Sequence, residues 1–184
     1  MKHQITKHMK KFFLICALFV SATTFAQNQL QTETTNMITY ASGHIMELAE
    51  AIPEDKYSWA PEEGVRSVSG VIVHIISTNY FFGSKLGATV PDGVNMQTLE
   101  QELKTKADLT AALKQSTDFI VAAIKGVSED ALADKLEFPF PGEYTTMSAI
   151  LIAQSHCNEH LGQLIAYART NGITPPWSQT TAEN

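Results

Sequence analysis

Hydrophobic and polar residues alternate with the period of an α-helix in four long segments of the chain. In the first, from about Thr35 to Ala51, apolar or small side chains recur every three or four residues. The second, from about Val68 to Leu86, is apolar on most faces, which predicts a buried helix. The other two run from about Lys106 to Gly126 and from about Met147 to Thr170. The inward stripe predicted for the first helix consists of Met37, Ala41, His44, Leu48 and Ile52.

Capping residues mark the ends of these helices. Ser67 is placed to cap the second helix, and Thr105 with Asp108 forms a loose capping box for the third. Gly172 terminates the fourth helix. The segment 138–144, Phe-Pro-Phe-Pro-Gly-Glu-Tyr, can only be an extended loop or a short hairpin.

Four amphipathic helices without a convincing strand predict an all-α protein, a four-helix bundle. No internal repeat or Pro/Ser-rich linker divides the chain, so we expect residues 27–184 to form a single domain. About 20 residues separate the second and third helices, which is more than simple up-down-up-down wiring requires.

The N-terminus has the features of a secretory signal peptide. A basic stretch precedes the apolar run Phe12–Val20, and residues 24–26, Thr-Phe-Ala, suit cleavage before Gln27. The run of nine residues is too short for a membrane-spanning helix, which needs about 20. We therefore expect residues 1–26 to be a signal peptide, and the mature chain to be periplasmic or secreted without further membrane association.

Removal of this segment makes the chain strongly acidic. The full chain has a formal net charge of −6. Residues 1–26 contain four lysines and no acidic residue, so residues 27–184 carry 9 Lys and Arg against 19 Asp and Glu, a net charge of −10. Such a chain lacks the basic surface that binds a phosphate backbone, and we expect no nucleic-acid partner. Cys157 is the one cysteine left, so the fold must rest on its apolar core.

Three of the four histidines that follow residue 26 lie in strongly apolar helices. His156 and His160 are four residues apart and share a helix face, where two imidazoles can chelate one divalent ion. Gln163 lies on the same stripe as a polar neighbour. His74 stands among apolar residues, where an imidazole raises the free energy unless its nitrogens are bonded. One metal ion would satisfy all three imidazoles; hydrogen bonds to separate neighbours are the alternative.

Two other side chains are weaker candidates near this stripe. Glu159 directly precedes the second histidine, whereas a zincin protease needs its Glu directly after the first. A zincin is therefore excluded, and Glu159 lies either beside the metal ligands or on the surface, without the role of a general base. His44 lies on the inward stripe of the first helix, where it either approaches the site or packs in the core.

The fourth helix and its exit resemble a known family. The segment His156-x-x-x-His160-x-Gly162-Gln163-Leu164, followed by residues 166–176, is similar to the last helix of the DinB-like superfamily, which shares the bundle of the YfiT-type metal-dependent hydrolases. Residues 52–67 followed by His74 are similar to that family's first connector and second helix. The resemblance covers nearly all of residues 33–177. It implies up-down-down-up wiring and a divalent metal held by His74, His156 and His160, with water in the open positions.

Three histidines with an open position are typical of a catalytic metal site, because structural zinc normally has four protein ligands. Zinc, nickel or iron would activate water or polarise a substrate oxygen, so we expect a metal-dependent, hydrolase-like enzyme acting on a small molecule. Relatives within the superfamily use small thiols in transfer reactions, but such thiols are scarce outside the cytosol. A thiol-dependent transferase and a non-catalytic bundle that binds metal or another ligand are the alternatives. The sequence leaves the oligomeric state open, a dimer included.

Overall fold

The computed structural model describes residues 29–179 and is mostly helical. Short 3-10 turns lie in the connections between the main elements and after the last helix. Within residues 29–179, no helix is long and apolar enough to cross a membrane. The predicted signal peptide, residues 1–26, lies outside the described residues. The elements are α2 (Gln29–Ala51), α3 (Val68–Lys85), α4 (Leu99–Glu102), α5 (Lys106–Gly126), β1 (Lys135–Leu136), β2 (Tyr144–Thr145) and α6 (Thr146–Thr170).

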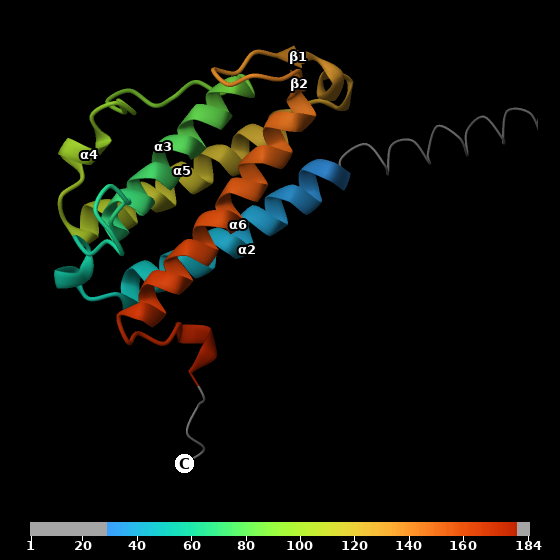
Figure 1. Cartoon of the computed structure of the whole chain (residues 1–184). Helices are drawn as coiled ribbons and strands as arrows, with labels where there is room; N and C mark the ends of the chain where they lie inside the picture. Colours follow the sequence, from blue (N-terminus) through green and yellow to red (C-terminus); the bar gives the residue numbers. More distant parts are fainter. Residues whose placement is uncertain (1–28, 180–184) are drawn as a thin grey trace, which may run out of the picture.

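The four long helices form a bundle with up-down-down-up wiring (Figure 1), as predicted. α2 and α6 run in one direction, and α3 and α5 run in the other. The order around the bundle is α2, α5, α3, α6, so α2 faces α3, and α5 faces α6, across the diagonals. Because α3 and α5 are parallel neighbours, their connection must return along the bundle, which explains its length and accommodates α4.

The caps predicted for α3 and α5 are present. The Ser67 hydroxyl accepts a hydrogen bond from the Gly70 N–H at 3.1 Å, and Thr105 and Asp108 form a reciprocal capping box. The segment before α6 is a short hairpin, because β1 pairs with β2 in an antiparallel ribbon. The prediction of a loop or short hairpin in this region is therefore confirmed.

The predicted start of the first helix and two residues of its predicted inward stripe were wrong. α2 begins at Gln29 rather than near Thr35, and its first turns bury polar side chains: Gln31 donates from Nε2 to the Val127 carbonyl at 3.2 Å. A search for apolar periodicity could not find such a segment. The inward stripe differs from the predicted one at two positions, because Ile38 is buried (1% exposed) in place of Met37 (51% exposed) and Ile45 is buried in place of His44. The observed stripe is Ile38, Ala41, Ile45, Leu48 and Ile52.

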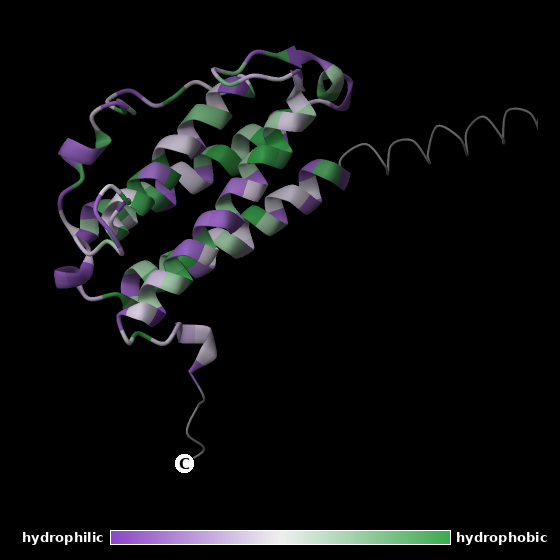
Figure 2. Cartoon of the chain, in the orientation of Figure 1, coloured by the Kyte–Doolittle hydropathy of each residue, from purple (hydrophilic) through white to green (hydrophobic). Residues whose placement is uncertain are grey.

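The core consists of two apolar clusters stacked along the bundle. One includes Val71, Ile75 and Leu164, and the other includes Ile120 and Ile150 near the hairpin. Figure 2 shows hydrophobic residues where α3 and α5 lie side by side. Cys157 is buried with its Sγ 3.5 Å from the Ser42 hydroxyl, in agreement with a packing role. α3 and α6, the two helices that carry the histidines, contact each other and both contribute to the first cluster.

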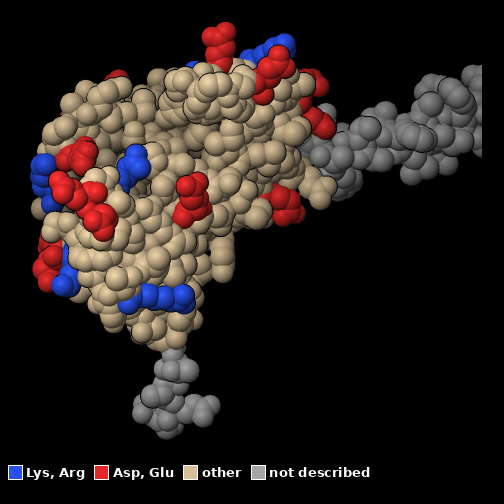
Figure 3. Space-filling view, in the orientation of Figure 1, with Lys and Arg blue, Asp and Glu red and all other residues tan. Residues whose placement is uncertain are grey.

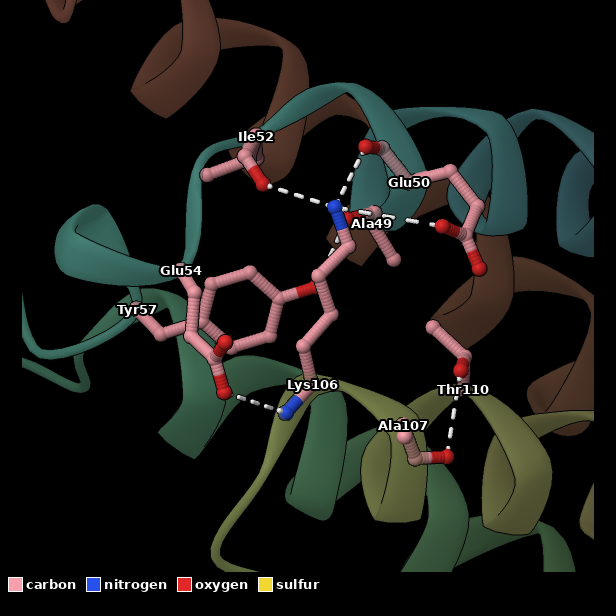
Figure 4. Close-up of polar contacts among 8 residues, drawn as sticks. All are labelled: Ala49, Glu50, Ile52, Glu54, Tyr57, Lys106, Ala107 and Thr110. Atoms are coloured by element: carbon pink, nitrogen blue, oxygen red, sulfur yellow. Dashed lines mark hydrogen bonds and ion pairs between the residues drawn. The ribbon is translucent and has the colours of Figure 1, made fainter.

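Lys106 joins the end of α2 to the start of α5 (Figure 4). Its ammonium donates to the backbone carbonyls of Glu50 and Ile52 and lies 3.8 Å from the Glu50 carboxylate. Its backbone N–H donates to Glu54 Oε1 at 3.1 Å. The last carbonyls of a helix lack partners within the helix and favour a cation, so this side chain caps α2.

Replacing Lys106 with methionine keeps the apolar stem and removes the ammonium. We expect the free energy of unfolding to fall by about 1–2 kcal/mol, because a charged donor to two carbonyls is lost. Urea unfolding measures this as a lower midpoint at unchanged slope. Lys114→Met is the matched control, since its ammonium pairs with the exposed Asp118 at 2.7 Å and should contribute less than about 0.5 kcal/mol. Equal losses in the two variants would contradict the capping role.

Candidate metal centre

The structure brings His74, His156 and His160 together. His74 comes from α3 and the other two from the neighbouring α6. Nε2 of His156 lies 2.9 Å from Nε2 of His74 and 3.1 Å from Nε2 of His160. The candidate ligand atoms of the three residues all lie within 4.8 Å of one another. His160 is buried, whereas His74 and His156 are half-buried.

A chain of hydrogen bonds decides which nitrogen of His160 carries its proton. Tyr167 Oη donates to the Arg66 carbonyl at 3.1 Å, an atom that can only accept. The Tyr167 oxygen therefore accepts from Gln163 Nε2 at 2.8 Å, which turns Gln163 Oε1 toward His160 Nδ1 at 2.7 Å. Nδ1 must be the donor, so the neutral ring presents a bare lone pair at Nε2 to the other imidazoles.

Burial keeps the other two rings neutral. Burial, followed by the charges of Arg66 and His160, lowers the pKa of His74 from 6.5 to about 4. Burial, the charges of His160 and His74, and then Arg66 lower the pKa of His156 to about 3. A neutral imidazole is the form that binds a metal ion, so both rings are in the ligand state near neutral pH.

These nitrogens fit a metal ion better than they fit one another. Nε2 of His160 carries no proton. If His156 Nε2 is protonated, its single proton cannot make good hydrogen bonds to both His74 and His160; if it is not, two nitrogen lone pairs face each other at 3.1 Å. Bonds of 2.0–2.1 Å to a tetrahedral ion place ligand nitrogens about 3.3 Å apart. The separations of 2.9 and 3.1 Å differ from this spacing by a few tenths of an ångström, and all three ligand atoms lie within 4.8 Å of one another. The donor set therefore suits a divalent transition metal.

Of the other three candidate site residues, Gln163 contacts the histidines, whereas Glu159 and His44 do not. Gln163 contacts His160 as described, but Glu159 is exposed on α6 and has no hydrogen-bond partner among residues 29–179. His44 packs against Trp177, with ring centroids 4.0 Å apart, and its Nδ1 lies 3.5 Å from Glu47 Oε2. Within the described part of the chain, His44 makes no contact with the three histidines. His44 was predicted to lie on the inward stripe through the same error of one residue that placed Met37 there; the buried residues are Ile45 and Ile38.

Two residues of the site were missed in the sequence. Tyr167 lies four residues after Gln163, and this spacing on one helix face could have identified it. Arg66 contributes its backbone carbonyl and lies in the connector between α2 and α3, so no local pattern points to it.

A pocket of about 570 Å³ opens beside His74. Its wall is built by the start of α3, the connector between α2 and α3, and the segment around α4. Arg66, Glu62, Glu63 and Glu100 are among the residues that line it. A small polar ligand therefore has room next to one of the candidate metal ligands.

The comparison with family models decides what kind of bundle this is. The model of the DinB superfamily matches residues 40–164, which is more than half of the chain. The chain belongs to the DinB superfamily. It is 27% identical over 130 residues to YjoA, an uncharacterized protein of Bacillus subtilis (strain 168), a match that covers 70% of this chain and 82% of YjoA. The resemblance noted in the sequence is thus confirmed.

Solved structures of DinB-like proteins share the fold. The crystal structure of YjoA has a TM-score of 0.62 at 25% identity and covers 81% of this chain and 99% of its own. A DinB-like protein from Bacillus cereus ATCC 10987 has a TM-score of 0.60 at 17% identity, with 75% and 90% covered. The colibactin self-resistance protein ClbS, solved with double-stranded DNA, has a TM-score of 0.56 at 18% identity, with 76% and 95% covered. Since ClbS holds DNA, the fold does not support the prediction of no nucleic-acid partner, which rests on charge alone.

Proposed function

We propose that this DinB-superfamily protein binds one divalent transition metal ion through His74, His156 and His160, and that it is a metal-dependent, hydrolase-like enzyme acting on a small molecule. The observation that carries the proposal is the convergence of three imidazoles, one of them oriented by the hydrogen-bond chain from the Arg66 carbonyl. Zinc, nickel and iron all accept such donors. Three protein ligands leave a coordination position for substrate.

The bound ion would supply Lewis acidity, polarising a substrate oxygen or lowering the pKa of water. The chain itself keeps the imidazoles neutral and oriented, and offers a polar pocket beside His74. The pocket beside His74 supports an enzyme over a non-catalytic binding bundle, since it gives a substrate room next to a candidate metal ligand. Hydrolysis is preferred to thiol transfer because residues 1–26 have the pattern of an export signal.

DNA binding is not part of the proposal. ClbS shares the fold, but residues 27–184 of this chain carry a net charge of −10, which opposes binding to a phosphate backbone.

Export is part of the proposal: chains recovered from the periplasm or the medium should begin at Gln27. Recovery of exported chains that begin at Met1 would contradict cleavage of the signal peptide.

Replacing Tyr167 with phenylalanine tests how the histidines are held. Without the hydroxyl, Gln163 loses the partner that orients it toward His160, and outer partners of metal-binding histidines typically contribute about 10–100-fold in affinity. We expect the zinc affinity of Tyr167→Phe to fall at least about tenfold in a chelator competition titration. Tyr40→Phe, on the exposed face of α2, is the control and should bind zinc as the parent does. Equal affinities in all three proteins would show that the hydrogen-bond chain has no part in metal binding.

Hydrolysis is tested with metal-loaded protein and chromogenic esters, amides and phosphoesters. Turnover should depend on added zinc, nickel or iron and should disappear in His160→Ala. Turnover that persists unchanged in His160→Ala would contradict a reaction at the three-histidine site. Stoichiometric metal without turnover of any substrate class would favour the non-catalytic binding bundle.

A further inference from the structure

Arg66 connects the histidine cluster to the pocket. Its carbonyl ends the hydrogen-bond chain that orients His160, and the residue lines the same pocket as His74. Among residues 29–179, no carboxylate lies within ion-pair distance of its guanidinium. Arg66 therefore brings a positive charge without a carboxylate partner to the pocket that His74 also lines.

A metal ion at the histidines would add positive charge beside the pocket. Imidazoles that bind a metal ion are neutral, so a divalent ion held by these three would keep both of its charges, and the Arg66 guanidinium would add a third. Neighbouring like charges raise the free energy unless an anion accompanies them. A guanidinium matches a carboxylate through two parallel hydrogen bonds. An anionic group on the ligand would balance these charges.

A carboxylate suits the site better than a phosphate. The N-terminus of a helix commonly binds phosphate through free N–H groups, but the first N–H groups of α3 are already bonded. A phosphate would therefore find Arg66 as its main partner, close to three glutamates, whereas a singly charged carboxylate needs only one guanidinium. The bonded groups are Val68 N–H to the Trp59 carbonyl, Ser69 N–H to the Tyr57 carbonyl, and Gly70 N–H to the Ser67 hydroxyl.

Three glutamates bring negative charge to the same pocket. Glu62 and Glu63 come from the connector between α2 and α3, and Glu100 comes from α4. All three are exposed. Figure 3 shows acidic side chains gathered over α4 and this connector. No lysine lines the pocket, so the three glutamates are suited to a cation.

We infer that this pocket takes a small ligand of the amino-acid or short-peptide class, with its carboxylate paired to Arg66 beside the histidines and its ammonium among Glu62, Glu63 and Glu100. The pocket volume of about 570 Å³ accommodates a molecule of this size. This inference rests on the proposed metal site and names the class of ligand that the site serves.

Calorimetric titration of the purified, zinc-reconstituted chain tests the inference with a matched series of probes. ε-Aminocaproate carries both charges well separated, caproate only the carboxylate and hexylamine only the ammonium; inorganic phosphate is the competing anion. We expect ε-aminocaproate to bind most tightly. Arg66→Gln should weaken it at least about tenfold, and Arg169→Gln, which alters the only other arginine, should not. Joint replacement of Glu62, Glu63 and Glu100 by glutamine should weaken ε-aminocaproate and leave caproate unchanged.

Equal affinity of the parent and Arg66→Gln for ε-aminocaproate would overturn the inference, as would tighter binding of phosphate than of caproate. Failure of the parent to bind ε-aminocaproate at all would also overturn it. Zinc content, measured in the same samples, separates this failure from that of the proposed function. A parent that retains no zinc refutes the metal site, whereas stoichiometric zinc with no dependence on Arg66 refutes the ligand class alone.

Discussion

Replacing His156 with alanine is expected to abolish the stabilisation that zinc gives the parent chain. His156 is the middle member of the cluster, since its Nε2 contacts the Nε2 atoms of both other histidines. A ligand present at a thousand times its dissociation constant stabilises the native state by about 4 kcal/mol. In a domain of this size that corresponds to roughly 8–16 °C in melting temperature. The parent should show such a rise when zinc replaces chelator, and His156→Ala should not.

The comparison with and without chelator separates metal binding from folding. In chelator, His156→Ala should melt close to the parent, because the alanine removes a contact between imidazoles that is poorly satisfied without an ion. His160→Ala should behave in the same way. Glu159→Gln is the control from the same helix, and it should keep both zinc and the thermal shift, since its side chain is exposed. An undiminished zinc shift in His156→Ala would refute the site.

Replacing Gly83 with alanine is expected to destabilise the bundle by about 1–3 kcal/mol. Alanine in a helix interior normally stabilises relative to glycine by up to about 1 kcal/mol, so the expected sign is reversed here. The cause is close packing of α3 on α5: a Cβ at Gly83 would lie 2.8 Å from Phe119 Cδ1 and closer still to Cε1. The Phe119 ring also packs against Tyr80, with ring centroids 5.1 Å apart, and cannot yield without disturbing it.

Urea unfolding of two further variants completes this test. Gly43→Ala is the control, because the new Cβ on α2 would meet no atom within 4 Å and should stabilise the chain. Combining Gly83→Ala with Phe119→Leu should recover part of the loss, since the smaller side chain makes room. A Gly83→Ala variant as stable as Gly43→Ala would contradict the close approach of the two helices.

The long helices and the histidine cluster could be predicted because their signals are local or strongly physical. His156 and His160 share a face by spacing alone, and His74 is conspicuous in an apolar helix. The up-down-down-up wiring came from the family resemblance, and the length of the connection between α3 and α5 agrees with it. Neither inference required knowledge of how side chains meet between helices.

What could not be predicted depends on contacts between distant segments. The proton position on His160 follows from the bond between Tyr167 and the Arg66 carbonyl, 101 residues apart in the chain. The first turns of α2 are held by Gln31 and the Val127 carbonyl, 96 residues apart. The pocket likewise joins Arg66 to Glu100 from separate connections. Helical periodicity also cannot decide between two stripes that are offset by one residue. For this reason Met37 was predicted to face the core, whereas Ile38 does so.

Elemental analysis of the purified chain beside His74→Ala tests the proposed metal centre most directly. His74 is the single ligand contributed by α3, so its removal leaves only the pair on α6. After equilibration with zinc and desalting, the parent should retain about one ion per chain and His74→Ala almost none. A parent without metal, or a variant that retains as much as the parent, would contradict the three-histidine centre.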